Sequence, residues 1–152
     1  MNQLFYQFYN PVLFAAIAGW GSAQILKFIL FFIQNKGANF ERLYGSGGMP
    51  SSHSALVCAA FAATGRLEGW NSPQFGIMFV IAAIVMYDAA NVRLEAGKHA
   101  QQLNRIMTRL FDMQIDIEDK GKEFKELLGH TPLQVFVGAM LGLGIGAVIP
   151  LQ

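Results

Sequence analysis

The apolar stretch from Pro11 to Gln34 most constrains how this chain folds, because Lys27 is its single charged residue. Roughly 20 apolar residues are enough for a helix to cross a bilayer. Over the whole chain, 53% of the residues are hydrophobic and 14% are charged, whereas a soluble domain carries about 25% charged residues. We therefore expect an integral membrane protein.

Three further apolar segments follow. The last of them begins with a helix start signal, in which Thr131 is the N-cap and Pro132 the first helical residue. The pattern predicts an all-α fold, a polytopic membrane helical bundle with about four transmembrane helices in a single domain. The predicted spans are residues 11–34, 52–70, 75–92 and 131–151.

Residues 96–127 have a different pattern. Leu103, Ile106, Leu110 and Met113 are spaced for one face of a helix, and charged residues occupy much of the remainder. We expect an amphipathic surface helix, or two, at the membrane surface or against the bundle.

Gly138, Gly142 and Gly146 recur at every fourth position of the last segment. Such a stripe lets helices approach closely in lipid, so its first interpretation is packing. Because four short spans make a thin bundle, we also expect a possible homodimer that uses this surface.

The basic residues indicate the orientation of the chain. Four spans place residues 36–50 and 93–128 on the same side, and Arg66 lies on the other. The positive-inside rule assigns the more basic side to the cytoplasm. The net charge of +1 gives no indication of nucleic-acid binding. The basic residues on the side that holds residues 36–50 and 93–128 are Lys36, Arg42, Arg93, Lys98, Arg105, Arg109, Lys120, Lys122 and Lys125.

The segment Met49-Pro50-Ser51-Ser52-His53-Ser54 follows a glycine-rich stretch and opens an apolar run. A helix N-terminus presents unpaired N–H groups and binds anions, and a histidine there can transfer a proton near neutral pH. The alternative is a serine N-cap beside an incidental histidine. His130, at the start of the last span, is a second histidine in a matching position.

The predicted topology gathers these residues at one end of the bundle, where Lys27, His53, Asp88, Arg93 and His130 would face a shallow pocket. Charged residues inside a membrane are costly, which favours a functional role for Lys27 and Asp88. The alternative is a structural ion pair between them or with Arg93.

Two motifs carry a resemblance to a known family. Residues 50–53 (Pro-Ser-Ser-His) resemble the Pro-Ser-Gly-His motif of the type 2 phosphatidic acid phosphatase and vanadium haloperoxidase superfamily. Residues 129–132 resemble its last motif, in which a histidine opens a glycine-rich helix. Residues 47–55 and 87–93 are similar to the divergent membrane branch of that superfamily, and the likeness covers residues 24–146.

The resemblance implies a phosphatase site that needs no metal and no cofactor. His130 would be the nucleophile that forms a phosphohistidine, and His53 would be the general acid. Arg93 would belong to the last motif, with Asp88 beside it in the catalytic group. The residues implied to bind the phosphoryl oxygens are Lys27, Gly48, Ser51, Ser52 and Arg42.

The chain departs from the family pattern at three places, one of which is a long insertion between Arg93 and His130. Gln134 stands where the family has an aspartate that orients the nucleophile, and Lys36 with Arg42 only approximates the first motif. The leading hypothesis is therefore a membrane-embedded phosphatase for a lipid phosphate or a related phosphomonoester or diphosphate. The alternative is a non-catalytic protein that binds anionic lipid headgroups or serves as a scaffold or regulator. A small transporter is a third interpretation.

Overall fold

The structure is a computed structural model that describes residues 9–35, 48–113, 124 and 129–151. The described residues form helices and contain no strand. The elements are α2 (Pro11–Asn35), α4 (Ser52–Glu68), α5 (Pro73–Tyr87), the π-helical turn η1 (Asp88–Val92), α6 (Arg93–Asp112) and α7 (Pro132–Val148). The all-α fold predicted from the sequence is confirmed.

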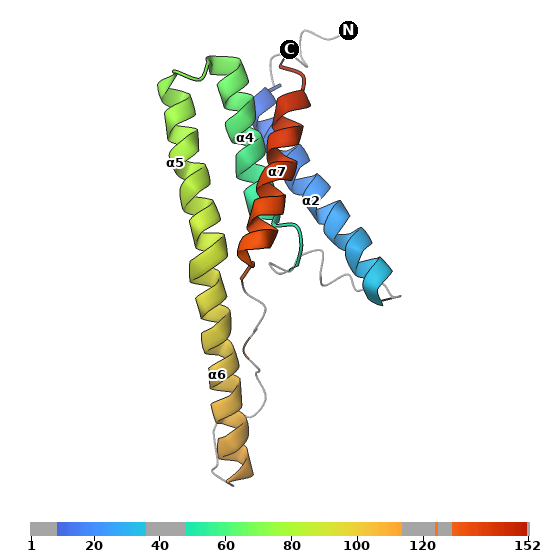
Figure 1. Cartoon of the computed structure of the whole chain (residues 1–152), viewed down its shortest axis with the longest axis vertical. Helices are drawn as coiled ribbons and strands as arrows, with labels where there is room; N and C mark the ends of the chain where they lie inside the picture. Colours follow the sequence, from blue (N-terminus) through green and yellow to red (C-terminus); the bar gives the residue numbers. More distant parts are fainter. Residues whose placement is uncertain (1–8, 36–47, 114–123, 125–128, 152) are drawn as a thin grey trace.

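Helix α4 is the centre of the bundle, with α2, α5 and α7 packed around it (Figure 1). Most of its residues are buried and most of the buried ones are small, including Ala55, Ala59 and Ala63, which are fully enclosed. Small side chains let the surrounding backbones come close, so this short helix forms the core although its own sequence is only weakly apolar.

The glycine stripe of α7 packs against α4 inside the chain. A Cβ atom on Gly138, Gly142 or Gly146 would collide with a backbone carbonyl oxygen of α4. These carbonyls belong to Ser51, Ala55 and Ala59, in that order. Because the stripe is buried here, it is not the exposed surface on which we based a homodimer, and the homodimer stays a prediction.

Side-chain caps fix the starts of three helices. Ser51 caps α4, Ser72 caps α5, and Thr131 forms a capping box with Gln134 at the start of α7. Each cap satisfies backbone N–H groups that have no partner within the helix. Helix α5 begins at Pro73, two residues before the predicted start.

Helices α5 and α6 form one rod, joined without a break by η1 (Figure 1). At a rise of 1.5 Å per residue the rod is roughly 60 Å long, about twice the hydrocarbon core of a bilayer. Helix α6 extends the axis of α5 away from the bundle, and the placement of residues 96–127 at a membrane surface stays a prediction. No proline interrupts the chain between Pro73 and Asp112 to turn it.

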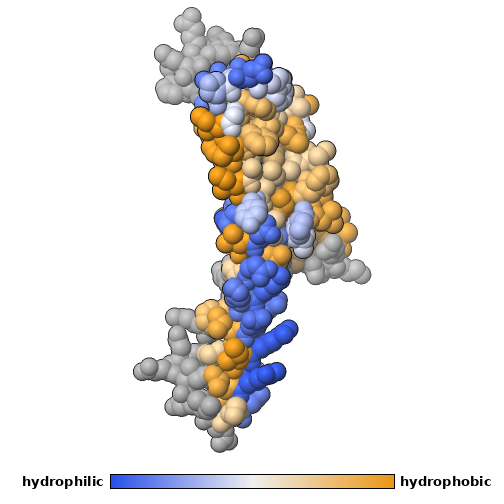
Figure 2. Space-filling view, turned by 60° about the vertical axis from the view of Figure 1, so that its left-hand side comes forward, coloured by the Kyte–Doolittle hydropathy of each residue, from blue (hydrophilic) through white to orange (hydrophobic). Residues whose placement is uncertain are grey.

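The surface of the molecule has two parts. The bundle is covered largely by hydrophobic residues, whereas α6 carries a hydrophilic stripe beside an apolar one that includes Leu103 and Ile106 (Figure 2). By length and composition, two helices could cross a membrane, Pro11–Ile33 and Pro73–Leu110, and α7 is a shorter apolar helix. These features agree with the predicted helical membrane bundle.

Candidate phosphate-binding site

The two histidines of the motifs lie at the same end of the bundle. His53 is in the first turn of α4, and His130 directly precedes the cap of α7. The two helix starts are joined because the Ser51 N–H donates to the Gln134 carbonyl oxygen at 3.0 Å. Two helix N-termini, each with a partial positive charge, therefore lie next to the histidines.

The turn η1 holds Arg93. In this π turn the Arg93 N–H donates to the carbonyl of Asp88, five residues earlier. The Asp88 carboxylate accepts a hydrogen bond from Arg93 Nε at 2.7 Å, which fixes the guanidinium at the edge of the site. This bond uses one of five N–H donors of the guanidinium, and the others are suited to phosphoryl oxygens.

His130 is fixed through its backbone and its side chain. Its N–H donates to the carbonyl of Ala89 in η1 at 3.2 Å. Its ring Nδ1 lies 3.3 Å from Gln134 Oε1. The whole side chain is buried, with 1% of its surface exposed.

The bond to Gln134 determines which ring nitrogen carries the proton. Gln134 Oε1 also accepts the Thr131 N–H at 3.0 Å, so this amide atom is an acceptor. His130 Nδ1 must then be the donor, and Nε2 keeps a free lone pair. Nε2 is buried and has no hydrogen-bond partner among the residues that the structure describes.

Lys27 contributes a second unpaired nitrogen. The side chain is 5% exposed, and its Nζ has no hydrogen-bond partner within the described part of the chain. Its methylene groups run past Gly48, where a Cβ would lie 3.5 Å from two of the carbons. Gly48 has φ +96, a conformation that side chains disfavour, so a glycine lets the loop pass over the lysine.

The surroundings keep His130 neutral. Burial is the largest cause and lowers the pKa of its imidazole below 6.5, and the charges of Lys27, His53 and Arg93 lower it further. The hydrogen bond to Gln134 acts in the opposite direction. Lys27, Arg93 and Asp88 are also close enough to His53 to act on its charge. A neutral imidazole with a free lone pair is the nucleophilic form of histidine.

The structure thus brings together five of the residues predicted from the sequence, and it gives Ser51 a further role. The Ser51 hydroxyl accepts from the Ser54 N–H and hydroxyl, so Ser51 is a helix cap as well as a candidate phosphate ligand. Ser52 is buried at the first position of α4. The five residues are Lys27, His53, Asp88, Arg93 and His130. Arg42 lies outside the described residues, and so does Lys36.

The contact of Gln134 with His130 was expected from the resemblance, but the Ala89 carbonyl and the capping role of Gln134 were not predicted. The carbonyl of Ala89 binds the His130 backbone, and no side chain marks such a group in a sequence. The capping role of Gln134 was detectable from the capping-box spacing Thr131-x-x-Gln134.

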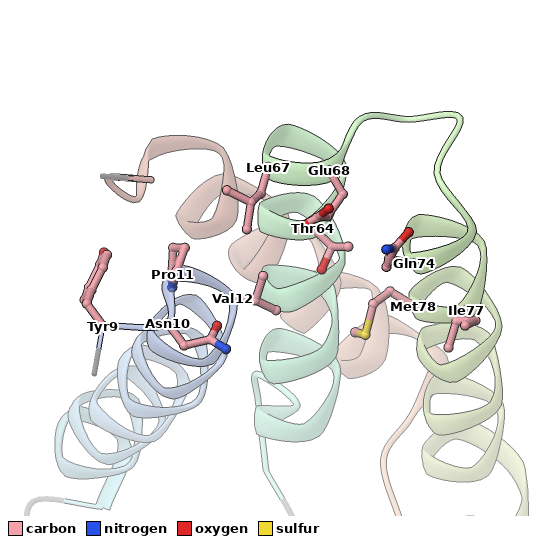
Figure 3. A pocket seen from close by; sticks show the side chains of 10 residues that line it. All are labelled: Tyr9, Asn10, Pro11, Val12, Thr64, Leu67, Glu68, Gln74, Ile77 and Met78. Carbon is pink, nitrogen blue, oxygen red and sulfur yellow. The ribbon is translucent and has the colours of Figure 1, made fainter. Parts of the chain in front are cut away.

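Other candidate sites lie elsewhere. No group of three or more His, Cys, Asp or Glu residues suited to a metal ion occurs in the described ranges. A cavity of about 610 Å³ opens at the opposite end of α4 (Figure 3). It is lined by Tyr9, Asn10, Pro11, Val12, Thr64, Leu67, Glu68, Gln74, Ile77 and Met78. Its lining residues on α4 come 11 to 15 residues after His53, which is roughly 17–23 Å along the helix.

Comparisons with known proteins show the family of the chain. The model of the divergent PAP2 family matches residues 8–145. The uncharacterized membrane protein YuiD of Bacillus subtilis (strain 168) is 33% identical over 148 residues, covering 92% of this chain and 94% of that protein. No solved structure matches. The chain is therefore a membrane protein that belongs to the divergent PAP2 family.

Proposed function

We propose that this protein is a metal-independent phosphatase that hydrolyses a lipid phosphate, or a related amphiphilic phosphomonoester or diphosphate, through a phosphohistidine. The observation that carries the proposal is a pair of buried nitrogens, Lys27 Nζ and His130 Nε2, that have no hydrogen-bond partner among the residues described by the structure. Buried polar groups without a partner are destabilising. A phosphoryl group supplies oxygens for the ammonium and an electrophilic phosphorus for the lone pair.

The first chemical step transfers the phosphoryl group to the protein. His130 Nε2 attacks phosphorus, the phosphorus–oxygen bond to the alcohol breaks, and protonated His53 donates a proton to the leaving oxygen. The positive charges of Lys27 and Arg93 stabilise the oxygens of the transition state, as phosphoryl transfer requires.

The second step restores the protein. A water molecule loses a proton to His53 and attacks the phosphohistidine, and the phosphorus–nitrogen bond breaks. Inorganic phosphate leaves, and both histidines return to their starting forms. The N–H groups at the start of α4 add to the positive potential around the phosphate.

The apolar surroundings favour an amphiphilic substrate. Leu133 and Phe136 on α7 lie within two turns of His130, and each is 62% exposed. A hydrophobic tail in the lipid phase would lie beside them while the phosphate enters the site. The basic residues of α6 support a multi-pass orientation with this end in the cytoplasm.

A non-catalytic role in binding anionic lipid headgroups, as a scaffold or regulator, is the second candidate. Gln134 favours it, because a neutral amide orients an imidazole without stabilising an imidazolium by charge. Such a protein would use the same cations to bind phosphate and would leave the ester intact.

The experiment compares phosphate release from a panel of lipid phosphates by the purified protein in detergent with release by His130→Ala and His53→Ala. We expect turnover by the parent and a loss of about 100-fold or more in each variant. His99→Ala is the matched control, because His99 is exposed on α6 away from the site. It should keep the activity of the parent.

Vanadate binding separates the two candidates. Binding by the parent without turnover of any substrate would favour the headgroup-binding role. If the folded parent binds neither vanadate nor phosphate, the site is not a phosphate site and both candidates fail.

A further inference from the structure

We propose that the π turn η1 is the positioning element of the site: it leaves the Ala89 carbonyl free to hold the backbone of the nucleophile, His130. The inference rests on the proposed phosphatase function. It assigns a positioning role to the Ala89 backbone carbonyl and to the extra residue that a π turn contains.

The hydrogen bonds of the turn explain why this carbonyl is free. In an α-helix the N–H of Arg93 would donate to Ala89, four residues earlier. In η1 it donates instead to Asp88, five residues earlier. The Ala89 carbonyl receives the N–H of His130, which comes from a segment 41 residues later in the chain. Ala89 is buried, so water does not take the place of the His130 N–H at this carbonyl.

The neighbouring residue confirms the closeness of this contact. A Cβ on Gly129 would collide with the backbone of Leu94 and approach that of Arg93. The chain before His130 therefore lies directly on the turn, backbone against backbone. A glycine is needed there for the approach itself.

The same turn also places Arg93. Its five-residue register brings the Asp88 carboxylate and the Arg93 side chain to one side, where they form the 2.7 Å ion pair. The two side chains are 39% and 42% exposed, so the pair adds little stability and its main effect is to orient the guanidinium. One element therefore fixes the nucleophile and a phosphate-binding cation relative to each other.

Deletion of Ala90 tests the role of the turn. The deletion makes the helix regular: Arg93 then lies four residues after Asp88 and keeps that partner, while the N–H of Leu94 reaches the Ala89 carbonyl. His130 loses its acceptor, and Lys27, His53 and Arg93 are retained. Because a misplacement of about 1 Å costs about 100-fold in rate, we expect kcat to fall by about that factor. KM should change less than kcat, since Lys27 and His53 lie outside the turn and Arg93 keeps Asp88 as its partner.

Amide hydrogen exchange at His130 is the second measurement, and it needs no activity. The amide should be protected in the parent and should exchange freely after deletion of Ala90. Ala90→Ser is the matched control, because it keeps the length of the turn and should match the parent in both measurements. Full activity with an unchanged exchange rate in the deletion variant would overturn the proposal.

Gly129→Ala provides an independent test if the deletion variant does not fold. Its Cβ would push the chain off the turn while the helix stays intact, so we expect the same loss of kcat and of His130 protection. A parent without turnover or vanadate binding would refute the phosphatase function alone. The exchange rates would still decide whether the turn holds His130.

Discussion

At the scale of single residues, Gln134 contributes both to the start of α7 and to the position of the His130 ring. One side-chain oxygen accepts the Thr131 N–H that starts α7 and the Nδ1 proton of His130. An aspartate at this position would also add a negative charge and favour the protonated imidazole. The amide orients the imidazole without adding a charge, and burial of the ring remains the main reason that the pKa of His130 is lowered.

The pH dependence of stability follows from the state of His130. The folded protein has a lowered pKa at this residue, mainly because the imidazole is buried, whereas the unfolded chain has the ordinary value of 6.5. Below that value the unfolded state binds more protons, so the contribution to stability is complete above pH 6.5 and is lost as the pH falls.

We therefore expect the free energy of unfolding to decrease as the pH falls below 6.5, and to decrease less in His130→Gln. Unfolding in mixed detergent micelles, followed by circular dichroism above and below this pH, measures both proteins. An equal pH dependence in the two would contradict the assignment of this effect to His130.

The residue types of the site were predictable, and their backbone partners were not. Lys27, His53 and His130 are recognisable because charged and titratable residues are rare in this apolar sequence. The carbonyl of Ala89 is chemically the same as every other carbonyl in the chain. Only the three-dimensional contact with His130 distinguishes it.

At the scale of elements, the contact of α7 with α4 depends on the absence of side chains. Gly142 faces the Ala55 carbonyl so closely that one added methyl group has no room. Gly144 lies on the same helix, but no neighbouring atom is within 4 Å of where its Cβ would be. The same substitution should therefore have opposite effects at these two positions of one helix.

We predict that Gly142→Ala destabilises the protein by about 1–3 kcal/mol, because the helices must move apart. Gly144→Ala is the matched control and should be neutral or stabilise by about 0.4–1 kcal/mol, because alanine restricts the unfolded chain. Unfolding of each purified variant in mixed micelles gives the two values. Similar losses in both would mean that the effect comes from the glycines themselves and not from the packing.

The helices were easier to predict than their junctions. Apolar composition and cap residues located the starts of α4 and α7, because those signals are local. The continuous rod through η1 was not predicted, since the extra residue of a π turn leaves no mark in the hydrophobic pattern. Its partner, the His130 amide, is distant in sequence.

At the scale of the whole molecule, the chemistry is concentrated at one end. The histidines and the cations lie at the start of α4, and the 610 Å³ cavity lies at its other end, near Glu68. In the proposed orientation, the two ends of the bundle face opposite sides of the membrane. The order of the spans predicted that the histidines and cations gather at one end, whereas the cavity and the projection of α6 required the structure.

Cysteine labelling in intact cells tests the orientation. In a Cys58→Ala background, Gln102→Cys on α6 should react with a membrane-impermeant maleimide only after permeabilisation, because that end is proposed to be cytoplasmic. Asn71→Cys, in the exposed turn before α5, should react without permeabilisation. The reverse pattern would place the site outside the cytoplasm.

Arg66 has a consequence for how the molecule lies in an electric field. Its guanidinium donates to the carbonyls of Gly146 and Ile149, so its positive charge is paired with the negative end of the α7 dipole. The end of the bundle that carries the acidic Glu68 then has little positive potential, while the opposite end carries the lysines and arginines. The bundle therefore has an electrical dipole. A membrane potential that is negative inside favours the proposed orientation of this dipole in the membrane.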